Sequence, residues 1–138
     1  VYDVATASWS VVAYAPGPAP SARWLFGFTY LNNKLWVFGG EDTSGNMLSE
    51  VWSFDINTLA WTLVSDNTPD PFKPSPRLWS GMAGAGNSIF VFGGQAASFP
   101  DGLAGSLSAL GGLFEFDTLS STWLDSSSSI SEAAPRSA

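Results

Sequence analysis

The 138-residue sequence contains no cysteine and no histidine. Without cysteine the chain forms no disulfide bond and no thiolate metal site. No cluster of metal ligands and no cofactor-binding motif stands out among the remaining residue types. We therefore predict that this chain holds no metal, no cofactor and no catalytic residue of its own.

Basic residues are scarce as well, with 5 lysines and arginines against 12 acidic residues and a net charge of −7. Binding to the backbone of a nucleic acid needs clustered lysine and arginine, so nucleic acid is not an expected partner. No apolar run reaches the roughly 18–20 residues of a membrane span, so none is predicted. Aromatic residues, in contrast, make up 14% of the chain, as expected for sheets that are covered on both faces.

Two markers recur along the chain in the same order. In the first, an aromatic residue precedes an aspartate, and a tryptophan follows six residues after the aspartate. Its three copies are Tyr2-Asp3…Trp9, Phe54-Asp55…Trp61 and Phe116-Asp117…Trp123. In the second, an arginine precedes a Val-Phe-Gly-Gly segment, and the copies are Arg23…Gly39-Gly40 and Arg77…Gly93-Gly94. A period of roughly fifty residues predicts a repeat protein with one four-stranded unit per repeat.

The order of these markers resembles the kelch repeat of β-propellers, and the resemblance covers essentially the whole chain. It implies an all-β fold made of four-stranded antiparallel blades. Kelch repeats often carry a histidine three residues after the arginine, whereas Phe26 and Ser80 stand there in this chain. Since a propeller needs about four to eight blades to close, we expect an incomplete ring. The remaining blades are then expected in the same chain or in neighbouring chains.

The repeat divides the chain into four expected parts. Residues 1–15 are expected to form outer strands of a preceding blade, and residues 128–138 to begin a following one. Residues 16–69 and 70–127 are the two full blades. The strands expected in the first blade are 25–31, 35–38, 51–54 and 61–64, and those of the second are 80–85, 89–92, 113–116 and 123–124.

Most marker residues have a structural interpretation. The glycines are expected where positive φ or a close backbone approach excludes a Cβ, rather than at a phosphate site. The aspartates are expected to cap the turn between the third and fourth strands. The tryptophans Trp9, Trp61 and Trp123 are expected to pack on the third-strand aromatic residue and on the next blade. Each arginine is expected near its own Gly-Gly turn, where it donates to loop carbonyls or contacts a ligand.

The second blade differs from the first in one connection. Phe54 follows Gly40 by fourteen positions, whereas Phe116 follows Gly94 by twenty-two. The long segment 95–112 is expected to be a loop without strands of its own, and such loops are usually functional or disordered. The alternative is that the segment packs over its own blade, or contacts the neighbouring one, in a structural role. Together with the neighbouring loops it gives a candidate binding face of Arg23, Glu41, Asp42, Arg77, Gln95, Phe99, Asp101 and Leu103.

Two function classes follow from the resemblance. The first is a non-enzymatic module that binds a protein partner through the loop face, because binding residues concentrate on loops held by a rigid scaffold. The alternative is a set of scaffold blades in a propeller enzyme acting on carbohydrate, similar to galactose oxidase or to sugar-acid mutarotases. The oxidases use histidine ligands and a cysteine-linked tyrosine, so this chain would supply only scaffold.

Overall fold

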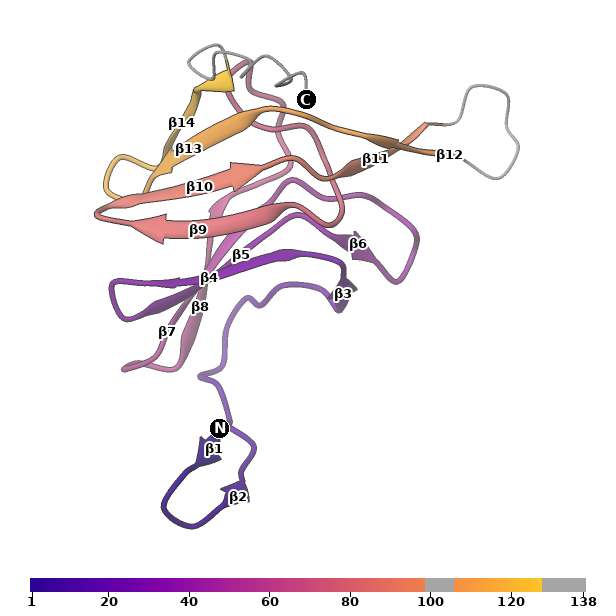
Figure 1. Cartoon of the computed structure of the whole chain (residues 1–138). Helices are drawn as coiled ribbons and strands as arrows, with labels where there is room; N and C mark the ends of the chain where they lie inside the picture. The colour runs from indigo at the N-terminus through magenta and orange to yellow at the C-terminus, as the bar shows by residue number, and fades with distance from the viewer. Residues whose placement is uncertain (99–105, 128–138) are drawn as a thin grey trace, which may run out of the picture.

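The computed structural model describes residues 1–98 and 106–127, and these residues form strands and turns with no α-helix. Two four-stranded antiparallel sheets dominate the fold (Figure 1). The first blade consists of β4 (Gly27–Leu31), β5 (Lys34–Phe38), β7 (Val51–Asp55) and β8 (Ala60–Ser65). The second blade consists of β9 (Gly81–Ala85), β10 (Ser88–Phe92), β13 (Leu113–Asp117) and β14 (Thr122–Asp125). This is the predicted all-β fold.

Within each blade the strands lie side by side in chain order, β4-β5-β7-β8 and β9-β10-β13-β14. Three pairs of short strands complete the described part of the chain. They are β1 (Tyr2–Asp3) with β2 (Ser8–Trp9), β3 (Arg23–Trp24) with β6 (Glu41–Asp42), and β11 (Gln95–Ser98) with β12 (Ser106–Ala109). The two blades do not close a ring. None of the described residues belongs to a helix that could cross a membrane.

The first strand of the first blade begins two residues later than predicted. Leu25 has a φ of 58°, in the left-handed region, so the extended backbone of β4 starts only at Gly27. Trp79 occupies the equivalent position before β9 and has a φ of 50°. Its backbone N–H donates to the carbonyl oxygen of Leu25 at 2.8 Å, which ties the two blades together at this bend.

The hydrophobic core lies between the two blades. The innermost strands β4 and β9 run side by side (Figure 1). They can approach closely because Gly84 has no side chain. A Cβ on Gly84 would lie 3.0 Å from the Cβ of Leu31. Farther out, the ring of Trp36 packs edge-on against Phe116 at 6.3 Å, and Phe38 against Trp123 at 5.5 Å. Small residues at the inner edge and aromatic residues farther out thus give a wedge-shaped contact.

The three marker tryptophans pack differently, which corrects part of the sequence-based prediction. Each contacts the third-strand aromatic residue of its own repeat, with ring centroids 4.9–5.1 Å apart. Only Trp123 also packs on another blade, and it is 9% exposed. Trp61 is half-buried and Trp9 is 80% exposed. The described residues place no further blade against Trp9 or Trp61, so neither ring is buried between two blades.

The repeated aspartates cap their turns as predicted. In each copy the Oδ1 atom accepts hydrogen bonds from the backbone N–H groups two and three residues later, at 2.7–3.1 Å. These backbone N–H groups, of Asn57 and Thr58 for Asp55 and of Ser120 and Leu119 for Asp117, lower the pKa of both carboxyls. The charged form of each aspartate therefore stabilises the turn.

Acidification is expected to destabilise the fold. Five aspartates have a pKa below the ordinary value of 3.8, and they are Asp42, Asp55, Asp66, Asp117 and Asp125. Because the folded pKa is the lower one, their contribution is complete above about pH 4 and is lost as the pH falls through the folded values. Thermal melting of the intact protein at pH 7, 4 and 2.5 checks this. Asp117→Asn keeps an amide cap but cannot titrate, so its melting temperature should fall less steeply.

The glycine pairs also behave as predicted. All four glycines have positive φ, between 60° and 107°. A Cβ on Gly40 would lie 2.7 Å from the carbonyl oxygen of Trp24, and one on Gly94 would lie 2.7 Å from that of Leu78. In each blade the end of the second strand therefore passes directly over the segment that leads into the first strand, and only glycine allows this approach.

The long connection of the second blade is not a structureless loop. Its flanks, β11 and β12, pair antiparallel, from Gln95 with Ala109 to Ser98 with Ser106. This hairpin extends outward beyond the end of the four-stranded sheet (Figure 1). The small and polar residues of these two strands carry no clear strand pattern, so the sequence predicted a plain loop here. Phe99, Asp101 and Leu103 lie outside the described residues.

Candidate binding face

The loop face is the edge of the blades at which the second strand ends and the first strand begins. Arg23 anchors it in the first blade and is only 4% exposed in its side chain. Its Nη1 donates to the carbonyl oxygen of Gly39 at 3.3 Å, and its Nε donates to that of Ser21 at 3.1 Å. The guanidinium therefore holds two loops together, which is the structural role that its position predicted.

Glu50 is the acidic partner of this arginine, and sequence reasoning missed it. Its Oε2 accepts from Nη2 of Arg23 at 2.7 Å and from the indole nitrogen of Trp52 at 2.8 Å. Its Oε1 accepts from the side-chain amide of Asn67 at 3.2 Å. Glu50 thus joins the arginine, the third strand and the connection to the next blade. No repeat marker includes it, because the second blade has Gly112 at the equivalent position.

Arg77 is therefore held differently from Arg23. It is 3% exposed, and its Nη1 donates to the carbonyl oxygen of Gly93 at 2.8 Å. Its guanidinium lies over the ring of Phe114, 4.9 Å from the centroid. Burial lowers the pKa of Arg77, and the nearby Asp125 opposes that shift. Since both guanidinium groups are buried, they support the loop face from beneath rather than form its surface.

The two acidic candidates of the first blade sit on the strand that pairs with Arg23. Strand β6 places Asp42 opposite Arg23 and Glu41 opposite Trp24. The carboxylate of Asp42 accepts from the side-chain amide of Asn46 at 3.0 Å and from the backbone N–H groups of Ser44 and Asn46. These bonds, led by the Asn46 amide, lower the pKa of Asp42. Asp42 therefore shapes a tight turn at the rim.

Gln95 begins the hairpin of the second blade. Its backbone N–H and carbonyl exchange two hydrogen bonds of 2.8 Å with Leu78, the residue after Arg77. Its side-chain oxygen is buried and has no hydrogen-bond partner among the described residues. The base of the hairpin is thus fixed to the segment that contains the buried arginine. The structure brings Arg77 and Gln95 together, and it brings Arg23 together with Asp42.

Three exposed aromatic residues add an apolar component to this face. Trp24, Phe26 and Trp79 are 44%, 40% and 52% exposed, and all lie within three residues of a marker arginine. Trp79 is also held at positive φ, a strained conformation for a bulky residue that surrounding contacts must maintain. Sequence reasoning named Phe26 only at the usual histidine position and passed over Trp24 and Trp79, because repeat spacing highlights the residues that the two blades share. The sequence did contain a signal for these residues. Aromatic residues follow each marker arginine in the segments Arg-Trp-Leu-Phe and Arg-Leu-Trp-Ser, beside a bend that depends on glycine.

The loop face offers a partner aromatic and acidic side chains rather than a cluster of reactive or metal-binding groups. Among residues 1–98 and 106–127, no three acidic side chains gather as metal ligands would. Its visible components are the exposed aromatic rings, the acidic rim and a hairpin that extends beyond the sheet. Large aromatic side chains with polar surroundings are typical of protein interfaces.

Comparisons with known proteins agree with the repeat pattern. The profile of the KLHDC2/KLHL20/DRC7 Kelch-repeats domain matches residues 1–138. Kelch domain-containing protein 3 of Rattus norvegicus is 30% identical over 128 residues, which cover 90% of this chain and 32% of that protein. Host cell factor of Drosophila melanogaster is 29% identical over 102 residues, covering 73% of this chain and 7% of that protein.

A third relative carries the name of an enzyme. The N-(sulfonatooxy)prop-2-enimidothioate sulfolyase of Thlaspi arvense is 31% identical over 88 residues, covering 63% of this chain and 25% of that protein. This chain therefore spans at most about a third of the length of these relatives.

Proposed function

Because the chain belongs to the kelch-repeat family, whose members are typically protein-interaction modules, we propose that it is a non-enzymatic module that binds a protein partner through its loop face. The rigid part of the site is the pair of packed blades. The variable part is the set of loops that the buried arginines hold in place. Binding residues on loops that a stiff scaffold positions lose little conformational freedom on binding.

The observation that carries this proposal is the β11–β12 hairpin. At the equivalent position, the first blade has only the short strand β6 and its bridge from Glu41 to Met47. The hairpin is therefore not required by blade geometry. It is anchored at Gln95 and projects outward, so it adds surface without contributing a strand to the sheet. Trp79 lies next to Leu78, the residue that pairs with Gln95 at the base of the hairpin, and its side chain is exposed. Its ring offers an apolar contact for a partner beside the hairpin.

Replacing residues 96–110 with a short Gly-Ser turn in the intact protein tests the proposal. We expect partner binding to be lost while the melting temperature stays close to that of the unchanged protein, because the replaced residues lie outside both four-stranded sheets. Partners would be captured with the unchanged protein and then titrated against both forms. Retained binding with a sharply lower melting temperature would show that the segment is architecture, and the proposal would fail.

A second candidate is a set of scaffold blades in a propeller enzyme, and the similarity to the sulfolyase favours it. The two candidates predict different results for the same hairpin replacement. As scaffold, this chain would support a reaction carried out by residues elsewhere, so the replacement would leave turnover of a sulfolyase substrate unchanged. As a binding module, the intact protein would have no such turnover to measure.

A further inference from the structure

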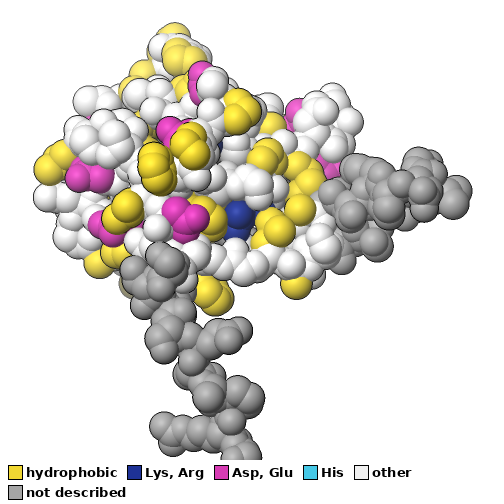
Figure 2. All heavy atoms as spheres, turned by 90° about the horizontal axis from the view of Figure 1, so that it is seen from above, with side chains coloured by type: hydrophobic (Ala, Val, Ile, Leu, Met, Phe, Trp, Pro, Cys, Tyr) yellow, Lys and Arg dark blue, Asp and Glu magenta, His cyan; other side chains and the backbone are white. Residues whose placement is uncertain are grey.

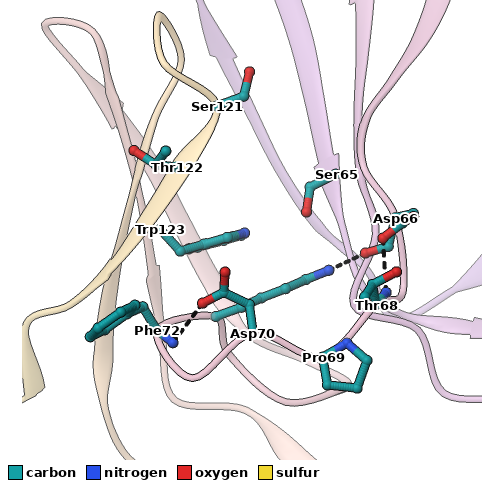
Figure 3. A pocket seen from close by; sticks show the side chains of 10 residues that line it. Ser65, Asp66, Thr68, Pro69, Asp70, Phe72, Ser121, Thr122 and Trp123 are labelled. Carbon is teal, nitrogen blue, oxygen red and sulfur yellow. Dashed lines mark hydrogen bonds between the residues drawn. The ribbon is translucent and has the colours of Figure 1, made fainter.

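A polar pocket of about 320 Å³ lies between the outer strands of the two blades. Its walls come from the end of β8, from the connection 66–73 between the blades, and from the start of β14 (Figure 3). Polar side chains predominate. The residues lining it are Ser65, Asp66, Thr68, Pro69, Asp70, Phe72, Lys73, Ser121, Thr122 and Trp123.

The indole nitrogen of Trp123 is the first sign that this pocket takes a ligand. Trp123 is 9% exposed, and its Nε1 is buried without a hydrogen-bond partner in the described part of the chain. Other buried indoles do donate: Trp36 to the carbonyl oxygen of Leu31 at 3.1 Å, and Trp52 to Glu50. A buried N–H without an acceptor is unfavourable. In Figure 3 the ring extends from β14 with its nitrogen toward Ser65 and Asp66.

A second donor lies in the same pocket. Lys73 is 8% exposed, and its ammonium group donates to the backbone oxygen of Asp66. An ammonium group has three N–H donors, so this bond leaves two for other acceptors. Burial lowers the pKa of Lys73, and Asp66 and Asp70 oppose that shift. The interior of the pocket therefore offers donors and favours a ligand that brings a hydrogen-bond acceptor.

The mouth of the pocket has the opposite character. Asp66 and Asp70 are exposed there, and each uses Oδ1 to accept a backbone N–H, of Thr68 at 2.9 Å and of Phe72 at 2.7 Å. Two carboxylates against one ammonium make the lining net negative, which disfavours a phosphate or a sulfate. Phe72 is 55% exposed and adds an apolar face beside the carboxylates. The mouth therefore favours a cationic group with an alkyl stem.

We propose that this outer pocket binds an extended basic segment of a protein partner. A backbone carbonyl of that segment accepts from Trp123 Nε1, and a lysine or arginine side chain lies beside Asp66 and Asp70 with its stem on Phe72. The inference rests on the proposed function as a protein-binding module, but it concerns the pocket between the blades rather than the β11–β12 hairpin. The net charge of −7 supports the choice of a basic partner, because complementary charge steers association. Figure 2 shows acidic side chains spread over one face of the molecule, with few basic ones among them.

The test uses short peptides as probes on the intact protein. N-acetylated tri-lysine amide is titrated against the protein, and the indole N–H signals are followed by NMR. Trp123→Phe identifies the signal, because it removes the N–H while keeping an aromatic ring in place. We expect the Trp123 signal to move with tri-lysine and to stay still with tri-glutamine or tri-glutamate. A signal that does not respond to tri-lysine overturns the proposal.

Matched charge variants separate a defined site from diffuse attraction to an acidic protein. Asp70→Asn removes a carboxylate at the mouth, whereas Asp3→Asn removes one from a turn in the β1–β2 pair, and asparagine can cap both turns. We expect Asp70→Asn to weaken tri-lysine binding about three- to tenfold, and Asp3→Asn less than about twofold. Equal effects of the two variants overturn the proposal. Failure here would leave the hairpin experiment unaffected, since that experiment measures a partner at the loop face.

Discussion

Replacing Trp123 with alanine is expected to lower the free energy of unfolding by about 3–5 kcal/mol, as truncation of a buried aromatic side chain does. The ring packs on Phe116 in its own blade at 4.9 Å and on Phe38 in the other blade at 5.5 Å. Its loss opens a cavity at the contact between the blades, so the two sheets are destabilised together. Urea unfolding of the intact protein, followed by circular dichroism, measures the change.

The chain supplies its own control for this experiment. Trp9 holds the same position in the repeat but is 80% exposed, with the ring of Tyr2 against it at 5.1 Å. Trp9→Ala should therefore change the free energy of unfolding by no more than about 0.5 kcal/mol in the described environment. Trp61, half-buried on Phe54, should fall between the two. Equal losses for Trp9→Ala and Trp123→Ala would mean that the contact between the blades is not what the repeated tryptophan stabilises.

Gly40→Ala is expected to be the second severe substitution. Gly40 has a φ of 89°, and a Cβ there would lie 2.7 Å from the carbonyl oxygen of Trp24. The conformation alone costs roughly 1–2 kcal/mol for a residue with a Cβ. The collision adds to this, because relieving it means moving β3 away from the bend. Gly40 also donates its N–H to the carbonyl oxygen of Arg77 at 3.0 Å, so a shift would disturb both blades.

Alanine substitutions at two other glycines distinguish the cost of positive φ from the cost of a steric clash of the new Cβ. Gly86 has a φ of 60°, but no atom lies within 4 Å of the position that a Cβ would take, so Gly86→Ala should show the conformational cost alone. Gly111 has neither positive φ nor a nearby atom, so Gly111→Ala should be close to neutral. The expected order of destabilisation in urea is Gly40→Ala, then Gly86→Ala, then Gly111→Ala. If Gly86→Ala matched Gly40→Ala, close approach would not be the reason for the glycine pair.

The fold was largely predictable because the geometry of a kelch repeat is specified locally. An aspartate caps a turn two and three residues away, and an asparagine pair such as Asn32-Asn33 adopts the positive φ that a hairpin turn needs. A glycine pair marks the end of a strand wherever a Cβ would collide. These requirements recur in both blades, so the repeat pattern together with the kelch resemblance located the eight strands of the two sheets and placed each arginine near its glycine turn, where it donates to a loop carbonyl.

The candidate sites were less predictable, because they depend on differences between the repeats. Glu50 completes the ion pair of Arg23, but Gly112 replaces it in the second blade, where Phe114 stacks on Arg77 instead. The pairing of β11 with β12 arises from a segment with no strong strand pattern. The outer pocket joins Lys73 and Trp123, which are fifty residues apart in the sequence. The repeat period predicts none of these three features, because each occurs in one blade only or joins different blades.

The sequence by itself therefore determined the family, the all-β blades, their strand order and the edge at which the loops gather. It did so because turn capping, positive φ and strand burial are decided within a few residues. Only the tertiary structure decided which tryptophan is buried, which arginine has a carboxylate partner and where a polar pocket opens. Those outcomes depend on which side chains of different blades meet, and the distance between two blades is set by packing rather than by spacing along the chain.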